Sequence, residues 1–537
     1  NYNINRFDIA ATVGWTGRYE NMNNIRVSTN GGLVTENWFD LNASRYTPSS
    51  TLQRMELLKT GYMGTLSLGW DNYLFLELTG RQERSSTLKD QSFFYPSANL
   101  SFLFTQAFHM PSWWNYGKLR LSYGIVGNAP ETYTANIVYE QGSDNGFTWN
   151  TIPSSWGNAD IRPEKKYEYE IGLESKFLNN RLGIDISYYN NRVKDQILST
   201  PQPSTSGVKN VLMNVGEVAN HGWDISISAT PILTRDFRWD LTANYGVYKN
   251  KVVKLADGVP YLEILNSGGS GIKIQAVEGQ PMGDIYAQVP QVNENGEYLV
   301  SDKGLYLNQT ELQKVGNINP AGVGGLFNSF SYKNVFLDFS IDFRIGGDVI
   351  NEMNQYATAV GLTPESLKYR DTEHGGLSYY YPGDNNSSGI PVQVDPSTGA
   401  GPNGEIIYHD GIILPGVVAS TGERNTRIIP AGYYYNTTYN WGTEAEQLTY
   451  RHSVFDNSYV KLRELTIGYQ FPEKMISKLG LGRLSVSVFG RNLFYFYKAL
   501  KNYDAESSVG TSWANQATVG SSTTATRSFG VSLRASF

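Results

Sequence analysis

The chain ends in the stretch RSFGVSLRASF, Arg527–Phe537, and this stretch decides the class of fold. Its apolar residues occupy every second position, namely Phe529, Val531, Leu533, Ala535 and Phe537. Side chains of a β-strand point alternately to its two faces, so the stretch predicts a strand with one apolar and one polar face. The wall strands of an outer-membrane barrel need this pattern, because lipid contacts one face and a wet lumen the other.

The same alternation recurs along the chain. We predict fourteen strands, at about residues 7–19, 58–70, 73–85, 94–106, 117–127, 165–177, 181–196, 214–229, 237–251, 323–332, 335–347, 457–471, 483–497 and 526–537. A globular strand has about 5–6 residues, whereas a tilted strand that crosses a bilayer needs roughly 9–11. The predicted lengths therefore favour strands that span a membrane.

The connections between these segments alternate between short and long. The short ones are 71–72, 107–116, 178–180, 230–236, 333–334 and 472–482. The long ones are 20–57, 86–93, 128–164, 197–213, 252–322, 348–456 and 498–525, of which only 86–93 is no longer than the short class. An antiparallel up-and-down barrel with tight periplasmic turns and long extracellular loops has this alternation, whereas a soluble sandwich or propeller has no reason for it. The predicted fold is therefore an all-β transmembrane barrel.

Composition excludes several classes of protein. The chain has 537 residues with 37 tyrosines and 54 glycines, an excess that favours β structure. It has no cysteine, which rules out disulfides and cysteine-bound zinc, and its net charge of -6 argues against nucleic-acid binding. The five histidines are scattered without metal-ligand spacing, and Asn293–Glu297 lacks the acidic spacing of a calcium loop. We predict no catalytic site, no metal and no cofactor.

Several segments resemble the C-terminal part of SusC-like TonB-dependent transporters, the outer-membrane nutrient importers of Bacteroidetes. The resemblance is carried by GKLRLSYGIVGN (Gly117–Asn128), IRPEKKYEYEIGLESKFLNNRLGIDISYYNNRVKDQI (Ile161–Ile197), NVGEVANHGWDISI (Asn214–Ile227), VGNINPAGVGGLFNSFSYKNVFLDFSIDFRIGGDV (Val315–Val349), NSYVKLRELTIGYQFP (Asn457–Pro472) and FGRNLFYF (Phe489–Phe496). Phe537 also resembles the terminal signal of outer-membrane barrels.

The resemblance implies properties that the residues alone do not. Family members have an N-terminal plug and a barrel of 22 strands, so we expect the fourteen strands to be the C-terminal part of a longer barrel. The remaining N-terminal part would supply the other strands and the plug. The resemblance further implies uptake of a glycan or oligopeptide, driven by TonB-ExbB-ExbD through the plug, with a SusD-like lipoprotein over the outer loops. The alternatives are a complete, passive pore of fourteen strands and a soluble or surface β-rich glycan-binding protein.

Two groups of residues are candidates for function. If the apolar register faces lipid, the lumen wall carries Glu168, Glu170, Glu174, Asp185, Asp338, Asp342 and Arg344. These side chains either form a wet polar wall or make ion pairs that seat the plug. The long loops carry aromatic residues suited to stacking on a sugar or packing on a peptide, among them Trp149, Trp156, Tyr380, Tyr434 and Trp441. Those aromatics would otherwise pack on a partner lipoprotein or on each other.

Overall fold

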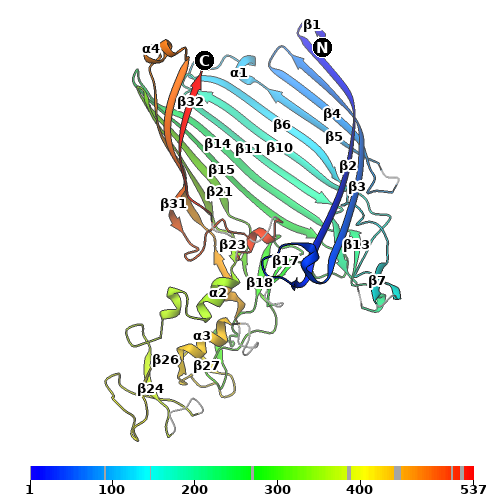
Figure 1. Ribbon diagram of the computed structural model, residues 1–537. Helices are drawn as coiled ribbons and strands as arrows, with labels where there is room; N and C mark the ends of the chain where they lie inside the picture. The colour runs from blue at the N-terminus through cyan, green and yellow to red at the C-terminus, as the bar shows by residue number, and fades with distance from the viewer. Residues whose placement is uncertain are drawn as a thin grey trace. The chain divides into compact units, whose positions relative to one another are not determined.

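The computed structural model describes residues 2–89, 92–144, 147–202, 204–267, 271–383, 389–440, 449–508, 512–520 and 525–537. Its main sheet has fifteen strands, hydrogen-bonded in their order along the chain (Figure 1). The chain divides into two compact units, one of residues 1–223 and 250–260 and the other of residues 224–249 and 261–537.

The first unit contains the N-terminal wall strands. These are β1 (Tyr2–Ile4), β2 (Phe7–Leu33), β3 (Ser44–Trp70), β4 (Leu74–Ser85), β5 (Ser92–Phe102), β6 (Trp114–Asn128), β10 (Glu164–Phe177) and β11 (Leu182–Lys194). Smaller strands lie in its connections: β7 (Glu140–Asp144), β8 (Phe147–Thr151), β9 (Ser155–Trp156), β12 (Ile197–Pro201) and β13 (Asn210–Asn214). The registers of these wall strands are antiparallel, for example Ile171 opposite Leu121 on β6 and Tyr188 on β11.

The second unit contains the C-terminal wall strands and the longest loops. Its wall strands are β21 (Gly322–Tyr332), β22 (Val335–Ile345), β30 (Tyr459–Gln470), β31 (Arg483–Lys498) and β32 (Ser528–Ser536). β14 (Glu217–Leu233) and β15 (Phe237–Lys254) each have residues in both units.

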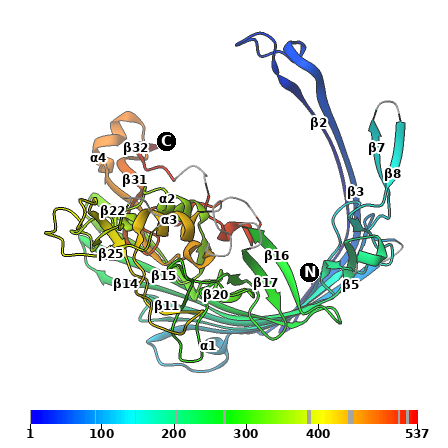
Figure 2. The ribbon, with the colours of Figure 1, turned by 90° about the horizontal axis from the view of Figure 1, so that it is seen from below.

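The loops of the second unit fold into small sheets and helices. The strands are β16 (Tyr261–Ser267), β17 (Ile272–Val277), β18 (Asp284–Ala287), β19 (Leu299–Val300), β20 (Gln313–Asn317), β23 (Asp348–Ile350), β24 (Leu377–Tyr380), β25 (Val392–Gln393), β26 (Tyr408–Ile412), β27 (Val417–Val418), β28 (Ile429–Pro430) and β29 (Val454–Asp456). The helices α2 (Glu352–Ala359) and α3 (Ala431–Tyr439) lie among them (Figure 2). A core of fully buried isoleucines, Ile272, Ile274, Ile285 and Ile350, holds part of this loop region together.

The apolar register of the wall strands is exposed. Tyr169, Ile171 and Leu173 on β10 are 46%, 48% and 41% exposed, and Val13 on β2 is 87% exposed. A soluble sheet would bury such a register, since burying a large apolar side chain is worth roughly 1.5–3 kcal/mol. A continuous band of exposed apolar residues on one face of a long antiparallel sheet is what lipid contact requires. Each of the fourteen predicted strands has its counterpart in the sheet, so the predicted fold is confirmed.

Three sequence predictions about the connections are wrong in detail. The predicted loop 20–57 is mostly strand, because β2 and β3 continue their ladder as far as Ser28 opposite Ser49 and beyond. Residues 104–106, predicted as the end of the strand 94–106, belong to the short helix α1 (Phe104–Ala107). The turn after β3 has three residues, 71–73, because Trp70 pairs with Leu74. In contrast, Lys333 and Asn334 form the predicted two-residue turn, with Tyr332 opposite Val335.

Another short helix, α4 (Glu473–Ile476), lies in the connection between β30 and β31. Among the described residues, no helix is both long enough and apolar enough to span a membrane.

Candidate functional site

The polar face of the first unit carries an ion-pair group around Arg120 of β6. The Arg120 guanidinium contacts Asp185 through two hydrogen bonds, Nη2 to Oδ1 at 2.6 Å and Nη1 to Oδ2 at 3.0 Å. It also lies 3.6 Å from Glu174 Oε2. Gly172 of β10 faces Arg120, and a Cβ there would lie 2.8 Å from Nη2, so the glycine leaves the room that the guanidinium fills. Two of the predicted wall residues, Glu174 and Asp185, thus share one cation.

Glu168 belongs to a second polar group on the same strand. It accepts one hydrogen bond from Asn191 Nδ2 at 3.1 Å, and its carboxylate lies 2.6 Å from Lys166 Nζ. Glu170, two residues on, faces Ser122 of β6 and Tyr189 of β11. The predicted acidic wall residues of β10 therefore lie in one register, with amide, hydroxyl and cationic partners around them.

The predicted wall residues of β22 have three different environments. Asp338 accepts a hydrogen bond from Ser329 Oγ at 2.6 Å, and Asp342 accepts one from Arg463 Nε at 2.6 Å. Arg344 donates hydrogen bonds to two backbone oxygens, those of Ile318 at 3.1 Å and Gly346 at 3.2 Å.

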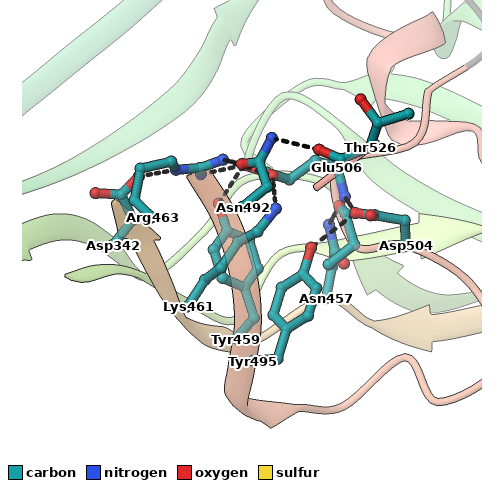
Figure 3. Close-up of polar contacts among 11 residues, drawn as sticks. Asp342, Asn457, Tyr459, Lys461, Arg463, Asn492, Tyr495, Asp504, Glu506 and Thr526 are labelled. Carbon is teal, nitrogen blue, oxygen red and sulfur yellow. Dashed lines mark hydrogen bonds and ion pairs between the residues drawn. The ribbon is translucent and has the colours of Figure 1, made fainter. Parts of the chain in front are cut away.

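The densest charged group of the second unit lies around Glu506, in the last outer loop (Figure 3). Its Oε2 lies 2.5 Å from Lys461 Nζ and 2.9 Å from Arg463 Nη1, and its Oε1 contacts Arg463 Nη2. Lys461 is only 1% exposed. Burial raises the pKa of Glu506, but the hydrogen bonds from Arg463 and Lys461 outweigh it and lower the pKa to about 2. Glu506 is thus a permanent anion at physiological pH.

Neighbouring residues of the same loop are fixed to β30 and β31. Asp504 accepts a hydrogen bond from the Tyr495 hydroxyl at 2.7 Å, and Asn457 Nδ2 donates to the backbone oxygen of Ala505 at 2.9 Å. Lys498 Nζ donates to the backbone oxygen of Tyr503 at 2.7 Å. Residues 503–506 therefore form an anchored segment, held by Asn457, β30 and β31; Figure 3 shows Asp504 and Glu506 of this segment with their partners.

Sequence reasoning missed this charged group. Arg463 lies at a β-bulge, since the partner of Leu462 on β22 is Ile341 and that of Glu464 is Ser340. The extra residue interrupts the alternation of side chains between the two faces of β30. An analysis based on strict alternation therefore assigns Arg463 to the wrong face. The run Lys461-Leu462-Arg463-Glu464, with three charges in one predicted strand, was the available signal.

The aromatic loop residues fall in separate places. Trp149 is 46% exposed on the β7–β8 hairpin, whereas the half-buried Trp156 packs edge-on to Tyr139. Tyr380 lies between the buried Tyr379 and Tyr381 on β24 and pairs with Val392. Trp441 lies outside the described residues.

Tyr434 lines a cavity of about 530 Å³ in the second unit, which we call the tyrosine cavity. Its walls come from residues 358–377, the end of β26 and the helix α3. The tyrosines that line it are Tyr306, Tyr369, Tyr434, Tyr435 and Tyr439. Three of these five, Tyr306, Tyr369 and Tyr439, were not singled out from the sequence, because their convergence on Tyr434 depends on the packing of the loop region.

One pair of loop residues has the chemistry of a hydrolase fragment. Ser378 Oγ lies 2.8 Å from His409 Nδ1, but Ser378 is only 2% exposed, so this hydroxyl is closed to a substrate. Among the described residues, no three histidines, aspartates or glutamates are grouped so as to hold a metal ion.

Comparison with known proteins gives one family and several relatives. The family model described as TonB dependent receptor-like, beta-barrel, matches residues 1–285. TonB-dependent receptor P3 of Formosa agariphila is 24% identical over 494 residues, which cover 84% of this chain and 42% of that protein. TonB-dependent receptor SusC of Bacteroides thetaiotaomicron is 30% identical over 247 residues, covering 42% of this chain and 24% of that protein. The chain thus spans less than half the length of these curated relatives.

A solved structure supports the fold. The structure of the RagAB peptide transporter superposes with a TM-score of 0.64 at 18% identity, covering 92% of this chain and 50% of that chain. The RagAB peptide importer in its open-open state gives a TM-score of 0.65 over a similar share. At this identity the likeness establishes the arrangement of strands.

Proposed function

Because the chain belongs to the family of TonB-dependent receptor-like β-barrels, we propose that it forms the C-terminal wall of an active nutrient importer of SusC type. The predicted family and the outer-membrane location are confirmed. The proposed activity is non-enzymatic uptake of a glycan or an oligopeptide. A plug in the N-terminal part of the polypeptide would receive energy from TonB-ExbB-ExbD.

This proposal rests on the contrast between the two faces of β10, one of which is apolar and the other charged. Ile171 and Leu173 are exposed toward lipid, while Glu174 of the opposite register pairs with Arg120. A wall that is apolar outside and charged inside separates a hydrocarbon phase from an aqueous passage. The predicted polar wall residues would line that passage, and we propose that they contact the plug.

The outer loops supply the proposed ligand and partner contacts. The anchored segment 503–506 and the tyrosine cavity lie in loops of the second unit. We propose that a SusD-like lipoprotein covers the outer loops, and that substrate binding favours the covered state through its higher affinity for that state. Trp149, Trp156 and Tyr380 remain proposed contacts for substrate or partner.

The test is purification of the native protein from outer membranes in detergent, followed by mass spectrometry. The proposal expects a plug-bearing segment of the same barrel and a SusD-like lipoprotein in the same particle. Recovery of this chain alone, monodisperse in water without detergent, would contradict the proposal. Uptake that persists after deletion of TonB would favour the alternative, a passive pore.

A further inference from the structure

The lining of the tyrosine cavity combines phenols with an aliphatic wall. The aliphatic side consists of Leu377, Ile412, Ile413, Leu414 and Pro415. The charged side chains at the cavity are Glu365 and Lys368. Among the described residues that line it, there is no asparagine, glutamine, aspartate or arginine. Its volume of about 530 Å³ lies within the roughly 300–1,000 Å³ of small-molecule sites.

Two of the tyrosines that line the cavity are held in place by further contacts. The Tyr435 hydroxyl donates to the backbone oxygens of Glu365 at 3.0 Å and Lys368 at 3.2 Å, which ties the turn to α3. The ring of Tyr439 stacks on His452 with centroids 4.4 Å apart. A ligand that enters this cavity therefore meets walls that are already ordered, and binding avoids the entropy cost of fixing them.

The phenols that line the cavity are neutral. Burial, followed by the nearby phenols of Tyr434, Tyr298 and Tyr369, raises the pKa of Tyr306 to about 12. Burial, followed by the nearby phenol of Tyr439, also raises the pKa of Tyr434. The tyrosines thus stay protonated at physiological pH and act as neutral hydrogen-bonding groups. The Lys368 ammonium lies 4.7 Å from the centre of the Tyr369 ring.

This combination distinguishes between the two classes of substrate that the proposed importer would carry. A sugar ring has a hydroxyl on most of its carbons, and burying a hydroxyl against the aliphatic residues without a hydrogen-bond partner opposes binding. An apolar amino-acid side chain gains free energy on the same wall, and phenol hydroxyls can pair with the amide groups beside it.

We propose that the tyrosine cavity binds an apolar or aromatic side chain of an oligopeptide. The inference deepens the proposed import function and rests on it for the biological role of the cavity. It assigns Tyr434 and Ile413, which both line the cavity, to one binding site, with the phenols of Tyr306 and Tyr369 as hydrogen-bonding groups. A peptide without a large apolar side chain would leave the aliphatic wall unfilled.

The test measures binding to the full native protein in detergent by isothermal titration calorimetry. The probes are the blocked pentapeptide Gly-Gly-Trp-Gly-Gly, its alanine analogue Gly-Gly-Ala-Gly-Gly, and maltopentaose. We expect the tryptophan peptide to bind at least tenfold more tightly than the other two. Tyr434→Ala should weaken its binding at least tenfold, and Ile413→Trp should do the same by filling the cavity while keeping every tyrosine.

Tyr261→Ala is the matched control, because Tyr261 on β16 is an exposed tyrosine in the loops of the same unit and does not line the cavity. It should leave binding of the tryptophan peptide unchanged. If Tyr434→Ala fails to fold, as judged by heat-dependent gel mobility, Ile413→Trp decides the matter. Equal binding of the two peptides, tighter binding of maltopentaose, or equal losses of peptide binding in Tyr261→Ala and Ile413→Trp would overturn the inference.

Uptake assays separate this inference from the proposed function. Cells would be tested for TonB-dependent uptake of the labelled tryptophan peptide and of labelled maltopentaose. Uptake of either probe with no effect of Ile413→Trp on peptide binding would leave the importer standing and remove the cavity inference. Cavity-dependent peptide binding without TonB-dependent uptake would remove the importer and leave a binding site.

Discussion

Trp239 donates a hydrogen bond from its Nε1 to Asn328 Oδ1 at 3.1 Å, on the apolar face of the second unit. Asn328 is 8% exposed and lies opposite Leu241 on β15 and Phe339 on β22. The indole also stacks on Phe330, with ring centroids 5.4 Å apart. A polar amide on a lipid-facing register is therefore covered and paired by a neighbouring tryptophan.

Trp239→Phe should destabilise the barrel by about 1–3 kcal/mol, because it keeps an aromatic ring but leaves the Asn328 oxygen without its donor. The measurement is urea unfolding of the protein in lipid vesicles. In the Asn328→Leu background the same substitution should cost less, since no amide is then left unpaired. Equal costs in both backgrounds would show that the hydrogen bond contributes nothing.

Ile171→Lys should hinder barrel assembly, whereas Glu170→Lys should be tolerated. The two residues are neighbours on β10 but belong to opposite registers. A lysine on the lipid face costs roughly 2–4 kcal/mol at the bilayer midplane, and one on the polar face stays in water. Heat-dependent gel mobility of membrane extracts reports the folded fraction. Similar folded fractions for the two variants would contradict the assignment of the faces.

Glu506→Gln should release the anchored segment 503–506. The substitution leaves the Lys461 ammonium buried without its counter-charge, and breaking a buried ion pair costs about 3–5 kcal/mol. We expect faster hydrogen exchange in residues 499–508, with little change in β10. The double variant Glu506→Gln/Lys461→Met should recover part of the protection, and its failure to do so would argue against the ion pair.

The same segment should respond to pH only in strong acid. The pKa of Glu506 falls from 4.5 to about 2 in the folded chain, so its stabilisation is present above pH 4.5 and is lost as pH falls through about 2. Protection of residues 499–508, corrected for intrinsic exchange rates, should be constant between pH 8 and pH 5. A loss of protection in that range that is absent in Glu506→Gln would contradict the low pKa.

His452 should make the loop region around it sensitive to mild acid. Burial, followed by the charge of Arg451, lowers the pKa of His452 from 6.5 to about 4. A depressed histidine pKa means that the unfolded chain binds the proton more readily, so stability declines as pH falls from about 6.5 toward 4. Hydrogen exchange of residues 449–456 should show this decline. His452→Phe keeps the ring stacked on Tyr439 and should remove it.

The wall strands could be predicted because the alternation of apolar and polar residues is visible within each strand separately. In β10, Ile171 and Leu173 alternate with acidic residues, which indicates that successive side chains face lipid and water in turn. Residues 20–57 escaped the same analysis because both faces of a strand are polar once it leaves the lipid. Asn21, Asn23 and Asn24 therefore look like loop residues.

The candidate site could be predicted only in part. Asp342 was recognisable from its register, but its partner Arg463 lies at a bulge, and Glu506 reaches both cations from a distant loop. Tyr434 was chosen from loop composition alone. The cavity around it depends on Tyr306 and Tyr369, which tertiary packing brings to the same place.

The long β2–β3 hairpin has a mechanical consequence. β4 stops pairing with β3 at Lys59, and the Ser86 amide still donates to the Leu58 oxygen, so the ladder from Leu57 to Ser44 has one neighbouring strand and extends for about 43 Å. Its Glu56 amide donates to the Tyr133 hydroxyl, which braces the ribbon close to where it leaves the wall. A two-stranded ribbon in water is marginally stable by itself. The ribbon should therefore be rigid up to Glu56, and its flexibility should increase from there toward its tip.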